Sequence, residues 1–465
     1  MQYLSTRGGI APVSFSEAVM MGLAEDGGLL LPRTIPRIGS ETLTAWQELG
    51  YQELALEIMS RFIDDIPRKE LQELIDRSYS SFDDEAITPL VKKGDVYILE
   101  LWHGPTLAFK DVALQFLGNL FEYMLKKDNS VLNIIGATSG DTGSAAIAGV
   151  RGKDRINIFI LHPKGRVSPV QEKQMTTVMD DNIFNIAIEG SFDDGQAIVK
   201  DIFNDTEFKH QYHLGAINSI NWARVLAQVV YYVYSTLQLM KKEKDFAVDF
   251  SIPTGNFGDI FAGYIARKML PQGTLRNLVL ATNGNDILSR MVQSGDYSLG
   301  EVKLTSSPSM DIQAASNFER YLFYLMDSDA VKTKNLMETF AAEGKIDLSD
   351  SMDQIRRDFS TASVSEEEVK DTIEKFYKEN DYLLDPHTAV GVCAAAENRD
   401  TGIPIVCLAT AHPAKFPAVV EEACGKVPVP PPQIDGLMEQ ESKCITMPAD
   451  KDEIQQYIAE HARRS

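Results

Sequence analysis

The stretch "VLNIIGATSGDTGSAAIAGV", residues 131–150, decides the class of fold. Its first eight residues are rich in Leu, Ile and Val and predict a short buried strand. Glycine and small polar residues follow, and "DTGSAAIAGV" then has the pattern of a helix. A strand, a glycine-containing turn and a helix in this order form the unit from which parallel α/β sheets are built.

Five further apolar runs end in the same way, at Gly, Asn, Thr or Pro. They are "INIFILH" (156–162), "FNIAIEG" (184–190), "FAVDFSIPT" (246–254), "LVLAT" (278–282) and "PIVCLAT" (404–410). Helical patterns follow most of them, so the sequence predicts right-handed crossovers and largely parallel sheets. Because the runs are continuously apolar and do not alternate with polar residues, we expect helices on both faces of each sheet.

Two regions do not follow this alternation of strands and helices. Residues 1–90 are mostly helical in pattern, and "WQELGYQELALEIMSRFI" (46–63) predicts one amphipathic helix. Residues 305–380 are acidic and helical and have the character of an insertion. We therefore divide the chain into a helical N-terminal region (1–90), interleaved α/β domains (91–300), an acidic helical subdomain (305–380) and a final segment (381–465) that returns strands to the sheet and ends in a helix.

Composition excludes several classes of function. The chain has 465 residues, 44% hydrophobic and 24% charged, which is typical of a globular protein. Its net charge of −22 argues against a nucleic-acid partner, which favours a basic surface. We expect no membrane span and no signal peptide. The four cysteines show no C-x-x-C spacing, so we expect no metal site and a reducing, cytoplasmic location.

Two glycine-containing loops are candidates for anion binding. They are "GATSGDTGSAA" (136–146) and "PTGNFGDIFAGYIARKM" (253–269), and each follows a predicted strand and begins a helix. Such a loop directs backbone N–H groups and a helix N-terminus toward one point, which suits an anionic group. The alternative is a well-capped α/β turn without a ligand. Neither loop matches the dinucleotide or P-loop nucleotide pattern.

Two further stretches place polar side chains beside predicted elements. In "LATAHPAKFP" (408–417), His412 and Lys415 follow the end of a strand, where ligands of parallel sheets usually bind. In "INSINWAR" (217–224), Asn218, Asn221 and Arg224 precede or begin an apolar helix. The alternatives are solvent-exposed loop residues and a capped helix start.

One lysine, in "LWHGPTLAFKD" (101–111), stands out from these surroundings because Lys110 lies next to an apolar run. A lysine amine has a reference pKa of about 10.4, and desolvation lowers it. A lysine of this kind is a nucleophile for a carbonyl group. A cofactor that carries both a carbonyl and a phosphate would use the lysine and one glycine loop together, and pyridoxal 5′-phosphate is such a cofactor.

Seven motifs in one order resemble the threonine synthase family. They are "HGPTLAFKD", "ATSGDTGSAA", "HPKGRVSPVQEKQM", "NSINWAR", "PTGNFGD", "DPHTAVG" and "TAHPAKF", and the opening residues resemble the long bacterial and fungal branch. The resemblance extends from residue 1 to about residue 425. It implies fold type II of the pyridoxal-phosphate enzymes, similar to the tryptophan synthase β-subunit, with two largely parallel α/β domains and the cofactor between them.

The resemblance also implies roles for residues around the cofactor. Lys110 is expected to hold pyridoxal 5′-phosphate through its amine and then to transfer protons. The cup for the cofactor phosphate is expected to consist of Gly255, Asn256, Phe257, Gly258 and Asp259. Thr410 is expected near the pyridine nitrogen, where a neutral hydroxyl moderates the withdrawal of electrons.

On the substrate side, the resemblance implies that Ser139, Gly140, Asp141 and Thr142 contact the amino-acid end, and Asn221 is a further residue expected to bind the substrate. Many relatives in this fold type have Asn at the position of Asp141, and an ionised carboxylate cannot donate a hydrogen bond. We therefore expect Asp141 to be protonated, to bind elsewhere, or to leave the cofactor's ring oxygen to Asn218 or Asn221. For the substrate phosphate, Arg224 and Lys415 are the preferred cations, and Arg166 and Lys164 are weaker candidates.

The implied reaction is a β,γ-elimination and replacement that converts O-phospho-L-homoserine and water into L-threonine and phosphate. The expected enzyme is cytoplasmic, a monomer or homodimer, with a small-molecule substrate and no nucleic-acid or membrane partner. One alternative is another fold type II enzyme, such as a threonine dehydratase or a phospholyase, which has no need for cations at a second phosphate. The other is a non-catalytic relative that keeps the fold as a binding protein.

Overall fold

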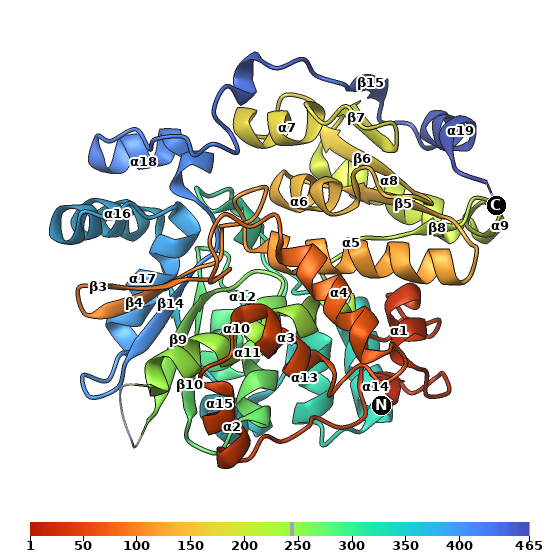
Figure 1. Ribbon diagram of the computed structural model, residues 1–465. Helices are drawn as coiled ribbons and strands as arrows, with labels where there is room; N and C mark the ends of the chain where they lie inside the picture. Colours follow the sequence, from red (N-terminus) through yellow and green to blue (C-terminus); the bar gives the residue numbers. More distant parts are fainter. Residues whose placement is uncertain (242–245, 465) are drawn as a thin grey trace. The chain divides into compact units, whose positions relative to one another are not determined.

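The computed structural model describes residues 1–241 and 246–464 and divides the chain into two compact units, each built around one large sheet (Figure 1). Unit 1 consists of Met1–Asp76, Phe82–His103 and Ser219–Pro428, and unit 2 of Arg77–Ser81, Gly104–Asn218 and Val429–Ser465. Within the described residues, no helix combines the length and the apolar character that crossing a membrane requires.

The large sheet of unit 1 has six strands in the order β13-β10-β9-β14-β4-β3. They are β13 (Ser360–Ser363), β10 (Leu275–Thr282), β9 (Val248–Pro253), β14 (Ile405–Ala409), β4 (Val96–Glu100) and β3 (Leu90–Lys93). Every neighbouring pair is parallel except β3 and β4. The expected largely parallel sheet is confirmed, because the predicted strands at 246–254, 278–282 and 404–410 form its centre.

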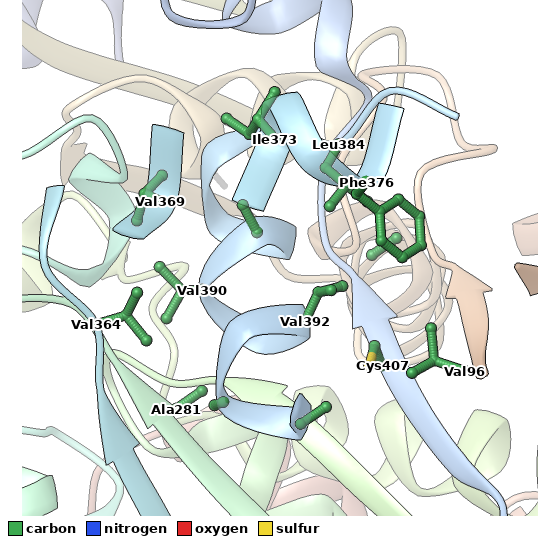
Figure 2. Close-up of a cluster of buried hydrophobic side chains, with 14 of the residues drawn as sticks. Val96, Ala281, Val364, Val369, Ile373, Phe376, Leu384, Val390, Val392 and Cys407 are labelled. Carbon is green, nitrogen blue, oxygen red and sulfur yellow. The ribbon is translucent and has the colours of Figure 1, made fainter. Parts of the chain in front are cut away.

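One face of this sheet is covered by α16 (Glu366–Asn380) and α17 (Pro386–Asn398). A buried hydrophobic cluster fills the space, and Figure 2 shows Cys407 of β14 near Val392 of α17, with Ile373 of α16 in the same cluster. All of this apolar area is removed from water, which is the main favourable contribution to folding.

The other face of the unit 1 sheet is covered by α10 (Trp222–Met240) and α11 (Gly258–Met269). The ring of Tyr232 in α10 lies 5.0 Å from the ring of Phe250 in β9. A Cβ atom at Gly263 of α11 would lie 2.9 Å from the Tyr232 ring, so the glycine permits this close packing. Both faces of the sheet are therefore covered, as the continuous apolar strands predict.

The sheet of unit 2 has five parallel strands in the order β15-β7-β6-β5-β8. They are β15 (Ile445–Pro448), β7 (Ile183–Glu189), β6 (Ile156–Pro163), β5 (Leu132–Ala137) and β8 (Leu214–Gly215). A second buried cluster packs α8 (Phe192–Asn204) and α19 (Lys451–His461) onto this sheet through Ile198 and Ile454. The predicted strands at 131–138, 156–162 and 184–190 are confirmed.

Two helices of unit 2, α5 (Lys110–Lys127) and α6 (Asp141–Val150), pack unusually closely. A Cβ atom at Gly118 would lie 2.0 Å from the carbonyl oxygen of Gly149, and one at Gly149 would lie 2.5 Å from that of Leu114. Only glycine fits at both positions, so these two residues set the separation of the helices.

The remaining elements are short helices and strands around the two sheets. In and after the N-terminal region they are β1 (Tyr3–Ser5), α1 (Phe15–Met21), β2 (Leu30–Pro32), α2 (Ser40–Trp46), α3 (Tyr51–Met59), α4 (Arg68–Tyr79), α7 (Pro169–Thr176) and α9 (Thr206–Gln211). Later in the chain they are α12 (Ile287–Ser294), β11 (Asp296–Ser298), α13 (Phe318–Leu325), α14 (Ala330–Glu343), β12 (Lys345–Asp347), α15 (Met352–Asp358) and α18 (Pro417–Cys424).

The prediction of one helix over residues 46–63 is wrong. The structure has two helices there, α2 ending at Trp46 and α3 beginning at Tyr51. Gly50 adopts an extended conformation before α3, and its N–H donates to the Glu53 carboxylate at 3.0 Å. This cap at Gly50 begins a new helix, although apolar residues continue at helical spacing before and after it. The segment 305–380, expected to be helical, also contributes β13 to the large sheet.

One buried carboxylate joins α10 to the start of α11. The Asp259 side chain accepts hydrogen bonds from the hydroxyls of Tyr231 at 2.5 Å and Tyr232 at 2.8 Å. Burial raises the pKa of the Asp259 carboxyl to about 6, although both hydrogen bonds act in the opposite direction. The carboxyl therefore lies inside the helix pair, and its ionisation opposes folding.

We expect Gly149→Ala to lower the free energy of unfolding by about 1–3 kcal/mol, because the new methyl group meets the Leu114 carbonyl. The gain in helix propensity, up to about 1 kcal/mol, is smaller than this clash. Urea unfolding measures the effect. Gly136→Ala is the control, since its Cβ has no neighbour closer than 3.8 Å. Unchanged or greater stability of Gly149→Ala would contradict the close packing.

We expect Asp259→Asn to become more stable relative to the native chain as the pH rises from 4 to 7. The folded carboxyl, with a pKa of about 6 against an ordinary 3.8, keeps its proton to a higher pH than the unfolded one. The native chain thus loses stability between these values, by about 2 to 3 kcal/mol in all, and the asparagine does not. Urea unfolding of the cofactor-free proteins at several pH values gives the difference; a constant difference would contradict the buried position of this group.

Candidate active site

Lys110 is the first residue of α5, and a turn before it fixes its position. The carboxylate of Asp111 accepts hydrogen bonds from the backbone N–H of Thr106 at 2.8 Å and from its hydroxyl at 2.7 Å. A Cβ atom at Gly104 would lie 2.4 Å from the Asp111 side chain, so the turn requires glycine there. The Lys110 side chain is 10% exposed, which places its amine at the edge of the unit 2 core.

The amine of Lys110 faces the carboxylate of Asp141. Nζ of Lys110 lies 3.6 Å from Oδ2 of Asp141, and Oδ1 accepts a hydrogen bond from Nε2 of Gln171 at 2.7 Å. Gly140 has φ +141°, and a Cβ atom there would lie 2.6 Å from the Gln171 amide. Gln171 is a site residue that the sequence did not identify. Its position inside the motif at 162–175 was the available signal.

The loop between β5 and α6 is closed by a hydroxyl. Oγ1 of Thr138 accepts hydrogen bonds from the backbone N–H of Gly140 at 3.0 Å and of Gly143 at 2.9 Å. These N–H groups are therefore engaged within the loop, while Ser139 is exposed and Thr142 is half-buried. What the loop offers a ligand is the Ser139 and Thr142 side chains and the N-terminus of α6.

In unit 1, the loop from β9 to α11 has an unusual backbone. Phe257 adopts a left-handed conformation with φ +64°, and its side chain is only 1% exposed. A Cβ atom at Gly255 would lie 2.7 Å from the backbone oxygen of Ser309. Among the described residues, nothing accepts a hydrogen bond from the backbone N–H of Asn256, Phe257 or Gly258. Such open N–H groups at a helix start suit a phosphate group.

A cage of rings surrounds Phe257. The centroids of Phe318, Tyr321 and Phe359 lie 5.5, 5.9 and 5.6 Å from the centroid of its ring. The side chain of Asp259 also points inward, toward the tyrosines of α10, so this residue presents only its backbone N–H to the loop. The aromatic contacts thus support a strained conformation that leaves the N–H groups open.

Thr410 follows β14 directly, and Thr254 follows β9. Because these strands are adjacent and parallel, their carboxyl ends lie at the same edge of the unit 1 sheet. The Thr410 side chain is buried, and Lys415, at the end of a short 3-10 helix (Pro413–Lys415), is fully buried. His412 caps this short helix by accepting from the N–H of Ala414, and burial lowers its pKa to about 4.

At the start of α10, two predicted residues differ in what they offer a ligand. Asn221 caps the helix by accepting from the N–H of Ala223 at 3.1 Å and donates to the carbonyl of Val19 at 2.8 Å. Arg224 is 4% exposed, and no described residue accepts a hydrogen bond from its Nε or Nη1 atoms. Burial lowers the pKa of Arg224 to about 10, so the side chain remains cationic at neutral pH. Lys164 and Arg166, the weaker candidates, are exposed.

A hydrogen-bonded cluster near the end of β4 was not identified from the sequence. His103 lies between two carboxylates, with Nδ1 2.6 Å from Asp83 and Nε2 2.9 Å from Glu100. Burial alone lowers the pKa of His103, but the bonds to both carboxylates outweigh it and raise the pKa above its ordinary value. Tyr382 donates a further hydrogen bond to Glu100 at 2.6 Å.

Each unit therefore brings together part of the predicted set. Unit 2 places Lys110 beside Asp141 and the loop 138–142, and unit 1 places the loop 254–258 and Thr410 at one sheet edge. The open N–H groups at 256–258 and the orphaned guanidinium atoms of Arg224 are suited to two anionic groups. A lysine amine in an apolar setting is suited to a carbonyl. Within its own unit, each set thus suits one chemical group of the kind that pyridoxal 5′-phosphate or a phosphorylated substrate carries.

Three family models match the chain. The model for the threonine synthase N terminus matches residues 2–79, that for pyridoxal-phosphate dependent enzymes matches residues 82–410, and that for the threonine synthase C-terminal part matches residues 388–458. Together they extend over nearly the whole sequence, and the model for pyridoxal-phosphate dependent enzymes includes Lys110, the loop 254–258 and Thr410.

Similar full-length proteins point to the same family. A threonine synthase from Schizosaccharomyces pombe is 46% identical over 96% of this chain and 95% of its own length. One from Pseudomonas aeruginosa is 45% identical over 100% of this chain and 99% of its own. The crystal structure of pyridoxal-phosphate-bound threonine synthase from Brucella melitensis superimposes with a TM-score of 0.96 at 44% identity, covering 100% of both chains. The chain therefore belongs to the threonine synthase family of pyridoxal-phosphate-dependent enzymes.

Proposed function

We propose that the chain uses Lys110 to hold pyridoxal 5′-phosphate and converts O-phospho-L-homoserine and water into L-threonine and phosphate. The assignment rests on the position of the Lys110 amine, which is nearly buried at the start of α5 and lies 3.6 Å from the Asp141 carboxylate. The match of the whole chain to threonine synthases supports the reaction. When bound, the cofactor supplies an electron-withdrawing ring that acidifies carbon-bound hydrogens of the substrate.

The backbone of residues 255–259 holds the cofactor phosphate in this proposal. The open N–H groups of Asn256, Phe257 and Gly258 and the N-terminus of α11 are the donors, and the buried Phe257 ring keeps them in place. Asp259 contributes its backbone only. Thr410 offers a neutral hydroxyl to the pyridine nitrogen, which leaves that nitrogen less strongly protonated than a carboxylate would.

Lys110 also transfers the protons. With the substrate bound, its amine would remove the proton from the α-carbon and would later return a proton to the product. Asp141, held by Gln171, orients the amine through its carboxylate. An ionised carboxylate is an acceptor only, which fits these two donors and leaves no hydrogen for the cofactor's ring oxygen. Among the residues considered for that oxygen, Asn221 already has both a donor and an acceptor partner.

Arg224 and Lys415 hold the substrate phosphate and stabilise it as it departs. The guanidinium of Arg224 has two orphaned nitrogens, and a planar fork with several donors suits a phosphate. Ser139 and Thr142 at the start of α6 bind the amino-acid end of the substrate through their hydroxyls, with the helix N-terminus favouring its carboxylate. Loss of a β-proton would accompany departure of phosphate from the γ-carbon; the γ-carbon would then take up a proton, and water would add its hydroxyl at the β-carbon.

The location and assembly are part of the same proposal. All four cysteines, Cys393, Cys407, Cys424 and Cys444, are unpaired, which fits a reducing cytoplasm. We propose a cytoplasmic enzyme that acts as a monomer or homodimer on a small-molecule substrate, and sedimentation of the purified protein distinguishes the two assemblies.

We expect Lys110→Ala to lower turnover by at least about 10³-fold, since it removes both the nucleophile and the proton carrier. Release of phosphate together with threonine from phosphohomoserine measures turnover, and thermal unfolding checks the fold. Lys110→Arg is the control, because it keeps a cation opposite Asp141 but no comparable nucleophile, and we expect it to be equally inactive. Retained turnover in either variant would refute the role of Lys110, and release of 2-oxobutanoate by the native enzyme would favour a dehydratase.

We expect Arg224→Gln and Lys415→Ala each to raise the KM for phosphohomoserine about tenfold or more, because each removes a charge-assisted hydrogen bond to the substrate phosphate. The Kd for pyridoxal 5′-phosphate should stay within about twofold. Lys370→Ala removes an exposed cation paired with Glu422 in the same unit and serves as the control. An equal rise in the cofactor Kd would assign these cations to the cofactor phosphate instead.

A further inference from the structure

The segment 305–380 contains a fully buried asparagine whose partners belong to two other loops. The backbone N–H of Asn317 donates to the carbonyl of Asn256 at 3.0 Å. Its side-chain amide donates to the same carbonyl and to the carbonyl of Ser219, both at 3.2 Å. Asn317 is 0% exposed. One side chain therefore bridges the loop that follows β9 and the loop that precedes α10.

A buried arginine one turn along the chain fixes this asparagine. Nη1 of Arg320 donates to Oδ1 of Asn317 at 2.5 Å, which orients the amide so that its N–H groups face the two carbonyls. The same guanidinium donates to the carbonyl of Ile220 at 2.5 Å and to that of Leu30 at 2.8 and 3.0 Å. Arg320 thus ties the loop before α10 to the N-terminal strand β2.

The environment of Arg320 is unusual for a cation. Its side chain is fully buried, and every hydrogen bond described for it ends at a neutral oxygen. Burial lowers its pKa to about 9, so it remains charged at neutral pH. The neighbouring carboxylate, Glu319, forms a salt bridge with Arg7, with 2.9 Å between Oε2 of Glu319 and Nη2 of Arg7. A buried charge of this kind is costly, and its two backbone acceptors, the carbonyls of Leu30 and Ile220, lie in segments that are far apart in sequence.

The bridged carbonyls adjoin the two proposed phosphate sites. Asn256 belongs to the loop assigned to the cofactor phosphate, and Ser219 and Ile220 directly precede Asn221 and Arg224. A second link runs in parallel, since the hydroxyl of Ser316 contacts the Ser219 hydroxyl at 2.8 Å and Oδ1 of Asn256 at 3.2 Å.

We propose that Asn317 and Arg320 are positioning residues that fix the cofactor-phosphate loop and the start of α10 relative to each other. They touch neither ligand; they act through backbone carbonyls of both loops, so that one buried pair sets the geometry of both anion sites. This role for the segment 305–380 rests on the proposed assignment of residues 255–259 and Arg224.

The test compares two binding constants in Asn317→Ala. The variant leaves the Asn256 and Ser219 carbonyls without their buried side-chain donor, so we expect the Kd for pyridoxal 5′-phosphate and the KM for phosphohomoserine both to rise about tenfold. Equilibrium titration of cofactor-free protein gives the Kd, and phosphate release from the loaded enzyme gives the KM. If Asn317→Ala does not fold, Asn317→Ser replaces it, because its shorter hydroxyl cannot reach both carbonyls; we expect the same joint rise.

Asn182→Ala is the matched control. The Asn182 amide also donates to two backbone carbonyls, those of Val150 at 2.9 Å and Ile156 at 3.0 Å, but all three residues belong to unit 2, whereas both loops belong to unit 1. We expect it to lose a similar amount of thermal stability with neither constant changed by more than about twofold. A purely structural role of Asn317 predicts the same result for both variants, and that outcome would overturn the proposal, as would a rise in only one constant.

A third variant separates this proposal from the assignment on which it rests. Gly255→Ala displaces the cofactor loop directly, since its Cβ meets the backbone of Ser309. If Gly255→Ala weakens cofactor binding and Arg224→Gln raises the KM while Asn317→Ala changes neither constant, the positioning role alone is refuted. If Gly255→Ala and Arg224→Gln also leave both constants unchanged, the loop assignment fails, and the positioning role fails with it.

Discussion

The proposed chemistry depends on one contact, the amine of Lys110 beside the carboxylate of Asp141. Each residue begins a helix, so the contact exists only because α5 and α6 pack closely at Gly118 and Gly149. A helix N-terminus favours an anion and disfavours a cation, which makes the position good for Asp141 and poor for an ammonium group. The carboxylate offsets that disadvantage, and Gln171 keeps it in place.

Unit 1 presents anion-binding groups on two loops, one after β9 and one before α10, and buried side chains support both. The adjacent parallel strands β9 and β14 bring Thr254 and Thr410 to one edge of the sheet. Aromatic rings support the left-handed Phe257, and Asn317 anchors the carbonyl of its neighbour Asn256. Most of these supports come from the segment 305–380, so an acidic stretch without any motif contributes the rigidity of the loops.

Much of the fold could be predicted from the sequence because buried parallel strands consist of continuous apolar residues. All six predicted strands are present, whereas β4 (Val96–Glu100) was not predicted because it is short and lies among charged residues. The dipeptide Gly94-Asp95, between β3 and β4, was an available hairpin signal. The break between α2 and α3 was missed because the apolar spacing continues across Gly50.

Individual side chains of the site were harder to predict than its loops. The sequence placed Lys110, the glycine loops and Thr410 at strand ends or helix starts, where the structure has them. It could not show that the Asp259 carboxyl turns toward Tyr231 and Tyr232, since that depends on how α10 packs against α11. The same holds for Gln171, whose partner Asp141 lies 30 residues away in sequence, and for Arg320, whose backbone acceptors lie 100 and 290 residues away.

Peptide mapping is the sharpest test of whether the Lys110 amine carries pyridoxal 5′-phosphate. The native enzyme is loaded with the cofactor, reduced with borohydride, digested, and analysed by mass spectrometry for a lysine that bears the reduced pyridoxyl group. We expect a single modified peptide that contains Lys110. Modification of another lysine in its place, or the absence of any modified peptide, would contradict it.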